Sequence, residues 1–181
     1  MRSVAAEQFL AWAAEHGIGP DERYPHSNSF AYLPPPNEWL ALDAPTETLG
    51  LIPFLSDVLD GIGEWQECLV WHRTGPWPDY SGEDDPCASL YSFMLGGAGI
   101  PLGFDGAIAF GRSDRHRLIA AAAAPILFGR TVWEDVLLFP DHGKLFLQCD
   151  HHQDVTLTFS EPPLAEPFML HMRERGHEVD D

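Results

Sequence analysis

The residues best suited to chemistry lie in one short polar turn in the last third of the chain. This polar turn, residues 149–154, reads Cys-Asp-His-His-Gln-Asp and so offers imidazole and carboxylate groups, which bind metal ions and transfer protons. Neighbouring histidines usually splay apart, however, and aspartates in such turns bond to nearby backbone N–H groups. We therefore expect no metal ion to bind here. The alternative is that the protein is an enzyme with a shallow metal or general acid/base site at Asp150 to Asp154.

No other stretch carries a recognised catalytic pattern. His171 and Glu174 have helical spacing, but Gly176 breaks the helix before His177. The zinc motif His-Glu-x-x-His and the nucleophile motif Gly-x-Ser-x-Gly are both absent from the sequence. The three cysteines are expected to be reduced, two of them buried in strands and the third beside acidic residues that disfavour a thiolate. The sequence therefore predicts neither a cofactor nor a catalytic nucleophile.

Aromatic and acidic residues gather in the loop 73–86. Aromatic side chains bordered by carboxylates are typical of a protein-binding surface directed at a basic partner, although the same aromatics could pack over a sheet while the acids stay solvated. We predict that this loop and the polar turn bind the partner. The predicted partner-binding residues are Trp77, Asp79, Tyr80, Glu83, Asp84, Asp85, Asp150, His151, His152 and Asp154.

The elements that position these segments are clearest around the polar turn. Alternating apolar residues predict three strands at 136–139, 145–149 and 155–159, joined by turn-forming residues at 140–143 and 150–154. In the third strand Val155, Leu157 and Phe159 alternate with polar residues, so one face is suited to a core and the other to water. The result is an antiparallel meander.

Helices and further strands are interspersed along the rest of the chain. Helices are predicted from Ser3 to His16, from Pro53 to Gly61, from Ser113 to Pro125 and over 167–175. Residues 87–95 are predicted to form a short helix with Leu90, Tyr91 and Met94 facing inward, with a strand as the alternative. Strands are predicted over 65–72, centrally in the sheet, and over 107–110. Residues 17–45 hold aromatics among prolines and are predicted to form an ordered wrapping segment. This order predicts one α+β domain over residues 1–181, an antiparallel sheet with helices packed on it, and a tail that frays over 176–181.

The chain is strongly acidic. Its 28 Asp and Glu residues against 10 Lys and Arg give a net charge of −18, which repels phosphate groups and argues against nucleic acids and anionic membranes as partners. No apolar run approaches the ~20 residues of a membrane span, and the N-terminus lacks the apolar region of a secretory signal. We expect a cytoplasmic protein. Its acidic surface either only keeps the protein soluble or steers it to a basic protein partner.

Four short stretches of the last third resemble a known class of proteins. They are Leu127-Phe128-Gly129, Trp133-Glu134-Asp135, Pro140-Asp141-His142-Gly143 and Asp150-His151-His152. Their pattern of strands and turns resembles the closing part of small acidic bacterial immunity proteins of polymorphic-toxin systems. The resemblance implies a cytoplasmic inhibitor that binds a cognate toxin domain and blocks its active site. A non-catalytic adaptor in a larger assembly is the other alternative.

Overall fold

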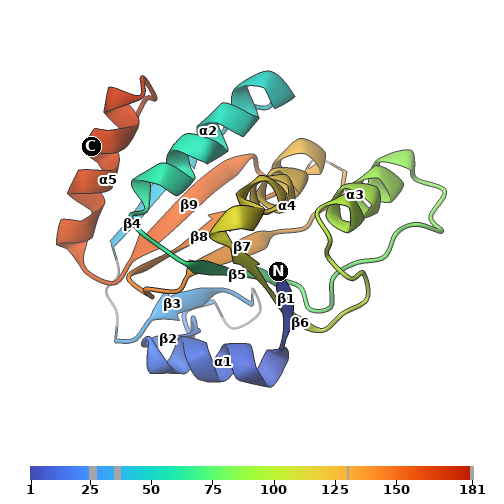
Figure 1. Cartoon of the computed structure of the whole chain (residues 1–181), viewed down its shortest axis with the longest axis horizontal. Helices are drawn as coiled ribbons and strands as arrows, with labels where there is room; N and C mark the ends of the chain where they lie inside the picture. The colour runs from blue at the N-terminus through green and yellow to red at the C-terminus, as the bar shows by residue number, and fades with distance from the viewer. Residues whose placement is uncertain (25–27, 35–37, 130, 180–181) are drawn as a thin grey trace.

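The fold is built on a seven-stranded antiparallel sheet (Figure 1). The structure, a computed structural model of the whole chain, describes residues 1–24, 28–34, 38–129 and 131–179. The strands follow the order β1-β6-β5-β7-β8-β9-β4, and every neighbouring pair is antiparallel. They are β1 (Arg2–Ala5), β4 (Glu38–Asp43), β5 (Glu67–His72), β6 (Gly106–Gly111), β7 (Val136–Pro140), β8 (Leu145–Cys149) and β9 (Asp154–Phe159).

Helices cover both faces of this sheet. One face carries α2 (Thr48–Gly61), α3 (Pro86–Gly97), α4 (Arg115–Phe128) and α5 (Ala165–Glu174), as Figure 1 shows. The other face carries α1 (Ala6–Glu15) and a hairpin of β2 (Ile18–Pro20) and β3 (Phe30–Tyr32). Short 3-10 turns at Arg112–Asp114 and Pro162–Leu164 precede α4 and α5. Among the described helices, none has the length and apolar character required to span a bilayer.

The alternation of strand residues divides the interior into two cores, one on each face of the sheet. In β9, Val155 and Phe159 are fully buried and pack with the helices α2 to α5. In β5, Cys68 and Val70 belong to the same core, whereas Leu69 belongs to the core beneath α1. Because β5 lies between β6 and β7 and is covered on both faces, its predicted central position is confirmed.

The predicted α+β class, the antiparallel sheet and the C-terminal meander are confirmed. The three meander strands are β7, β8 and β9, paired in a register that places Leu147 between Leu138 and Leu157. Gly143 takes a left-handed φ of 63° in the first meander turn, and Gln153 takes a φ of 75° in the second. Alternation and turn chemistry act between neighbours in the chain, which is why this part could be predicted.

The N-terminal quarter differs most from the predictions. Ser3 does not cap a helix; it lies in β1 opposite Ile108 of β6, and α1 begins only at Ala6. The segment predicted only to wrap the domain contributes β2, β3 and the edge strand β4, in which Leu40 pairs with Leu157. Within that segment, residues 25–27 and 35–37 lie outside the described residues. Strands of this kind are stabilised by partners far along the chain, so their own sequences carry little signal.

Element ends differ from the predictions in three places. Pro53 lies inside α2 and not in its first turn, and α4 continues through Pro125 because the residues around that proline are buried against the sheet and neighbouring helices. The tail predicted to fray is attached to α2 at His177, whose Nε2 lies 2.9 Å from Asp57 Oδ2. Residues 180 and 181 lie outside the described residues.

Candidate functional site

An apolar groove runs along α3. Asp85 caps this helix, since its Oδ1 accepts the N–H of Cys87 at 2.8 Å. One face of α3 is buried, and on the opposite face Phe93 is 79% exposed and Leu90 is 53% exposed. The groove is open to solvent and has a volume of about 710 Å³. Residues lining this α3 groove include Ser89, Leu90, Phe93, Gly96, Gly97 and Leu102.

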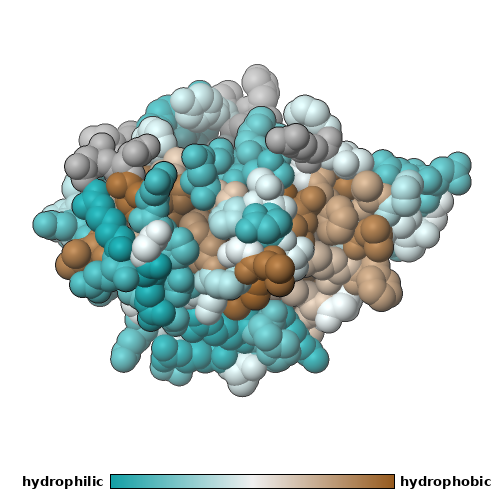
Figure 2. Space-filling model, turned by 90° about the horizontal axis from the view of Figure 1, so that it is seen from above, coloured by the Kyte–Doolittle hydropathy of each residue, from teal (hydrophilic) through white to brown (hydrophobic). Residues whose placement is uncertain are grey.

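The α3 groove belongs to an apolar patch on the helical face of the molecule. Seen from that face, hydrophobic residues gather over α3 at the right, while much of the surrounding surface is hydrophilic (Figure 2). Single exposed apolar residues are normal, but a contiguous patch rimmed by polar residues marks an interaction site. Helix α3 packs against α4, and no element within the described residues covers its Phe93 face.

Two glycines of the α3 groove are not required by the fold. Gly96 and Gly97 are exposed in the last turn of α3 and have no left-handed φ, unlike Gly99, whose φ is 90°. A Cβ built on either residue would meet no described atom within 4 Å. Glycine inside a helix is less favourable than alanine by roughly 0.5–1 kcal/mol. Contacts among the described residues therefore give no reason for glycine at either position.

The acidic part of the loop 73–86 borders the start of α3. Asp79 and the three acids at 83–85 are all exposed. Two serines of α3 hold this loop, because Ser92 Oγ accepts the N–H of Tyr80 at 2.7 Å and Ser89 Oγ donates to the carbonyl of Tyr80 at 3.1 Å. The predicted acidic residues therefore lie at the N-terminal end of the α3 groove.

Trp77 corrects one prediction, because it does not reach the surface. Its exposed fraction is 0%, and its indole N–H donates to the carbonyl of Gly106 at 3.0 Å. Burying so large an apolar side chain stabilises the loop against β6, and its one polar atom is satisfied there. The assignment of Trp77 to a partner surface is therefore wrong, and the exposed aromatic residue nearby is Phe93. Leu90, predicted to face inward, is also exposed.

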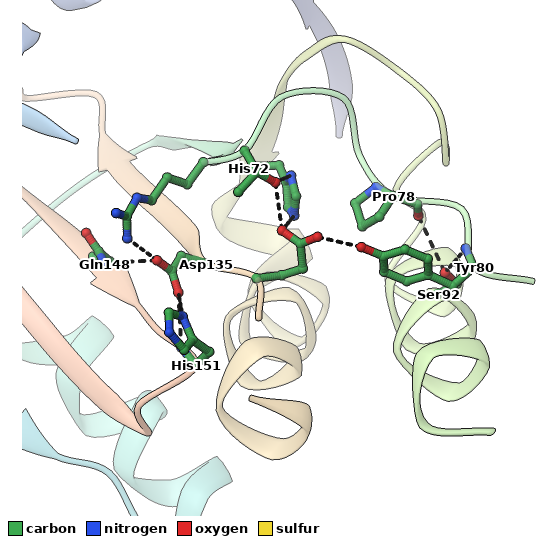
Figure 3. A network of polar contacts seen from close by, with 10 residues as sticks. His72, Pro78, Tyr80, Ser92, Asp135, Gln148 and His151 are labelled. Carbon is green, nitrogen blue, oxygen red and sulfur yellow. Dashed lines mark hydrogen bonds and ion pairs between the residues drawn. The ribbon is translucent and has the colours of Figure 1, made fainter. Parts of the chain in front are cut away.

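A half-buried carboxylate, that of Glu134, ties the same loop to the start of β7. The side chain of Glu134 is 13% exposed and accepts hydrogen bonds from Tyr80 Oη at 2.5 Å and from Thr74 Oγ1 at 2.7 Å. The fully buried His72 lies with Nε2 3.3 Å from Glu134 Oε2, without the alignment of a hydrogen bond. Figure 3 shows Tyr80 and His72 within this network of polar contacts. The loop that leads to α3 is thereby fixed by charge-assisted contacts.

The pKa of Glu134 makes this attachment sensitive to acid. Burial raises the pKa of the carboxyl, but the contacts with His72, Tyr80 and Thr74 more than offset burial, and the pKa falls to about 2. A carboxyl whose pKa is lower in the folded than in the unfolded state stabilises the fold above its unfolded pKa, 4.5 for Glu134, and that stabilisation is lost as the pH falls towards 2.

Glu134→Gln should therefore change the pH dependence of stability. We expect the variant to unfold more easily than the wild type at neutral pH and to lose less stability between about pH 4.5 and pH 2, because the amide does not titrate. Urea unfolding at a series of pH values measures this difference. Glu64→Gln, at an exposed position, should keep the acid sensitivity of the wild type. If the free energy of unfolding of Glu134→Gln and of the wild type changed with pH in parallel, the acid sensitivity would not come from Glu134.

The neighbouring carboxylate, Asp135, joins the polar turn to the same network. Its side chain is buried and accepts the backbone N–H of His151 at 3.0 Å, the Nδ1–H of that ring at 2.7 Å and Nε2–H of Gln148 at 3.3 Å. It also pairs with the guanidinium of Arg73. Glu134 and Asp135 thus connect the two predicted partner-binding segments, the loop through Tyr80 and the polar turn through His151 (Figure 3).

These two carboxylates were not predicted as site residues. Their signal is an acidic pair directly before a strand, β7, in which every residue is buried. Carboxylates beside a fully buried strand become partly buried themselves and then require hydrogen-bond donors. An acidic pair at such a position therefore indicates a network of hydrogen bonds. Phe93 had no comparable signal, because helical spacing alone does not distinguish an exposed phenylalanine from a buried one.

The polar turn is organised by its own first aspartate. Asp150 is 8% exposed and accepts the N–H of His152 at 2.8 Å and of Asp154 at 3.2 Å. The imidazoles of His151 and His152 do not splay apart as expected, since their centroids lie 4.1 Å apart. Within the described residues, no group of three His, Cys, Asp or Glu is arranged to hold a metal ion. The chemistry left to this turn is proton transfer by His151, which Asp135 orients.

The cysteines offer no activated thiol in the sheet. Cys68 and Cys149 are buried, and burial raises the pKa of both thiols well above the usual range. A thiol that stays protonated is a poor nucleophile. Cys87 is half-buried in the first turn of α3.

The chain matches no protein-family model, no curated protein and no solved structure. Its function is therefore inferred from the α3 groove, the acidic loop beside it and the network around Glu134 and Asp135.

Proposed function

We propose that this protein is a non-catalytic, immunity-type inhibitor that binds a basic toxin domain through the α3 groove and the acidic loop beside it. The observation that carries the proposal is the exposure of Phe93 and Leu90 next to the acids at 83–85. An exposed aromatic anchor beside charged residues is the usual composition of a protein-binding surface. The sequence resemblance to immunity proteins supports the same function.

The charge of the protein supports the choice of a basic partner. A net charge of −18 attracts a basic protein over long distances and raises the rate of encounter. The acids at the N-terminal end of the α3 groove would then orient the partner before Phe93 is buried. In this mechanism the carboxylates mainly set the association rate, whereas the apolar contact mainly sets the dissociation rate.

Capture of the partner followed by a toxicity assay tests the proposal. The tagged protein is purified from its native host, and the co-purifying protein is then expressed alone and together with this chain. We expect a basic protein that arrests growth when expressed alone and is harmless in the presence of this chain. A captured protein that is harmless alone and stays bound under all conditions would instead identify an adaptor and contradict the proposal.

Neutralising two acids near the groove should slow binding of that partner. Glu83→Gln combined with Asp84→Asn is expected to lower the association rate roughly threefold or more at low salt, with little change in the dissociation rate. The matched control is Glu7→Gln with Glu15→Gln, which removes the same charge from exposed positions of α1 on the opposite face of the sheet. Surface plasmon resonance at two salt concentrations measures both rates. Equal effects of the two double variants would place the partner elsewhere.

Proton transfer by His151 is the second candidate function. Asp135 holds Nδ1 of the ring at 2.7 Å, and Nε2 makes no hydrogen bond to a described residue. A carboxylate-oriented imidazole of this kind acts as a general base in hydrolytic enzymes. Hydrolysis of nitrophenyl esters and phosphates by the wild type and by His151→Ala separates the candidates, since only an enzyme would lose turnover in the variant.

A further inference from the structure

We infer that the toxin domain seats a basic amphipathic helix in the α3 groove, with the backbone of that helix packed directly against Gly96 and Gly97. This inference rests on the proposed function and specifies how the partner is recognised. Three observations carry it: the two glycines, the origin of the groove-lining residues, and the charge around the groove.

The glycines indicate close approach of another backbone. Both are exposed, both line the groove, and a Cβ at either would stand in open space among the described residues. Alanine would make a more stable helix, and no contact of the described residues forbids it. The backbone of a partner lying against α3 would explain the two glycines, because only glycine leaves that part of the helix surface free of side-chain atoms.

The lining residues favour a helix over a strand as the occupant. They come from α3, from Ser81 in the loop before it and from Leu102 in the connection after it, so the groove presents no unpaired strand edge for a partner strand to extend. Leu90, Phe93 and Gly97 lie at the spacing of one helix face, which matches the apolar stripe of an amphipathic partner helix. The 12 residues of α3 span about 18 Å, which corresponds to roughly three turns of such a helix.

Charge identifies the polar face of that helix as basic. The exposed acids at 83–85 lie at one end of the groove, beside the start of α3. Lysine or arginine side chains on the polar face of the partner helix would meet these carboxylates at that end of the groove. The same charges disfavour a second copy of this chain as the occupant, because two molecules of net charge −18 repel each other.

A designed peptide tests the occupant without knowledge of the toxin. The probe has about 18 residues, enough to be helical, with leucine along one face and lysine and alanine on the other. A matched peptide carries glutamate in place of lysine. Amide-resolved NMR of the full chain should show shifts confined to residues 85–105 with the lysine peptide and none with the glutamate peptide. Shifts elsewhere, equal binding of both peptides, or dimerisation of the chain through this face in sedimentation would overturn the inference.

Side chains placed at the glycines test the close approach. Gly97→Ala and Gly97→Leu should leave the melting temperature unchanged or higher, while Gly97→Leu should weaken binding of the lysine peptide and of the captured toxin by about tenfold or more. The control is Ala14→Leu, which also creates a leucine side chain at an exposed helical position, here in α1. If Gly97→Leu kept its affinity for a toxin that the chain still neutralises, the inference of a partner helix packed against Gly96 and Gly97 would be refuted. The proposed function would stand. A chain that neutralises no captured protein would refute the proposed function, whatever the peptide does.

Discussion

Phe93→Asp should weaken binding of the captured partner by about 100-fold or more and abolish protection against it, without unfolding the protein. Phe93 is 79% exposed, so the wild-type fold buries little of this side chain and loses little when it is replaced. In the complex the same ring would be desolvated at the centre of the contact, and a carboxylate there would lack a partner. Calorimetric titration and a thermal melt of the same samples measure both effects.

The control for Phe93→Asp is Leu49→Asp. Leu49 is 90% exposed at the start of α2, outside the α3 groove, so this variant makes the same kind of change on the same face of the sheet. We expect its affinity and growth protection to equal those of the wild type. If Leu49→Asp weakened binding and Phe93→Asp did not, the contact surface would lie over α2 and the α3 groove would lose its proposed role.

Asp135→Asn should lower the free energy of unfolding by about 3 kcal/mol, the largest change in stability that we expect from one buried polar residue. Every group that contacts this carboxylate is a donor: the backbone and ring N–H groups of His151, the amide of Gln148 and the guanidinium of Arg73. An asparagine has one acceptor oxygen and one NH₂ group, so on one side two donors would face each other. Because Asp135 is 3% exposed, water cannot readily relieve that conflict.

Urea denaturation at neutral pH measures this loss, and Asp105→Asn serves as the matched control. Asp105 is exposed, and its substitution should change stability by less than about 0.5 kcal/mol. If Asp135→Asn were as stable as the control, the contacts around Asp135 would contribute nothing to the fold. We would then no longer regard this residue as the link between the loop 73–86 and the polar turn.

Short-range patterns predicted the meander and the centre of the sheet. In β9 the alternation of Val155, Leu157 and Phe159 with threonines is visible within six residues, and all three apolar side chains are buried as expected. The edge strands β1 and β4 were missed because each depends on a partner far along the chain, as the pairing of Ser3 with Ile108 illustrates. A strand that is stabilised mainly by its partner need not show a strong pattern of its own.

The sequence by itself determined the charge of this protein, its α+β class and the acidic character of the loop before α3. Only the tertiary structure decided that Trp77 is buried while Phe93 is exposed, and that Glu134 and Asp135 connect two segments widely separated in the chain. The physical reason is that charge and alternation belong to residues and their neighbours, whereas burial and hydrogen bonding depend on which distant elements pack around a side chain.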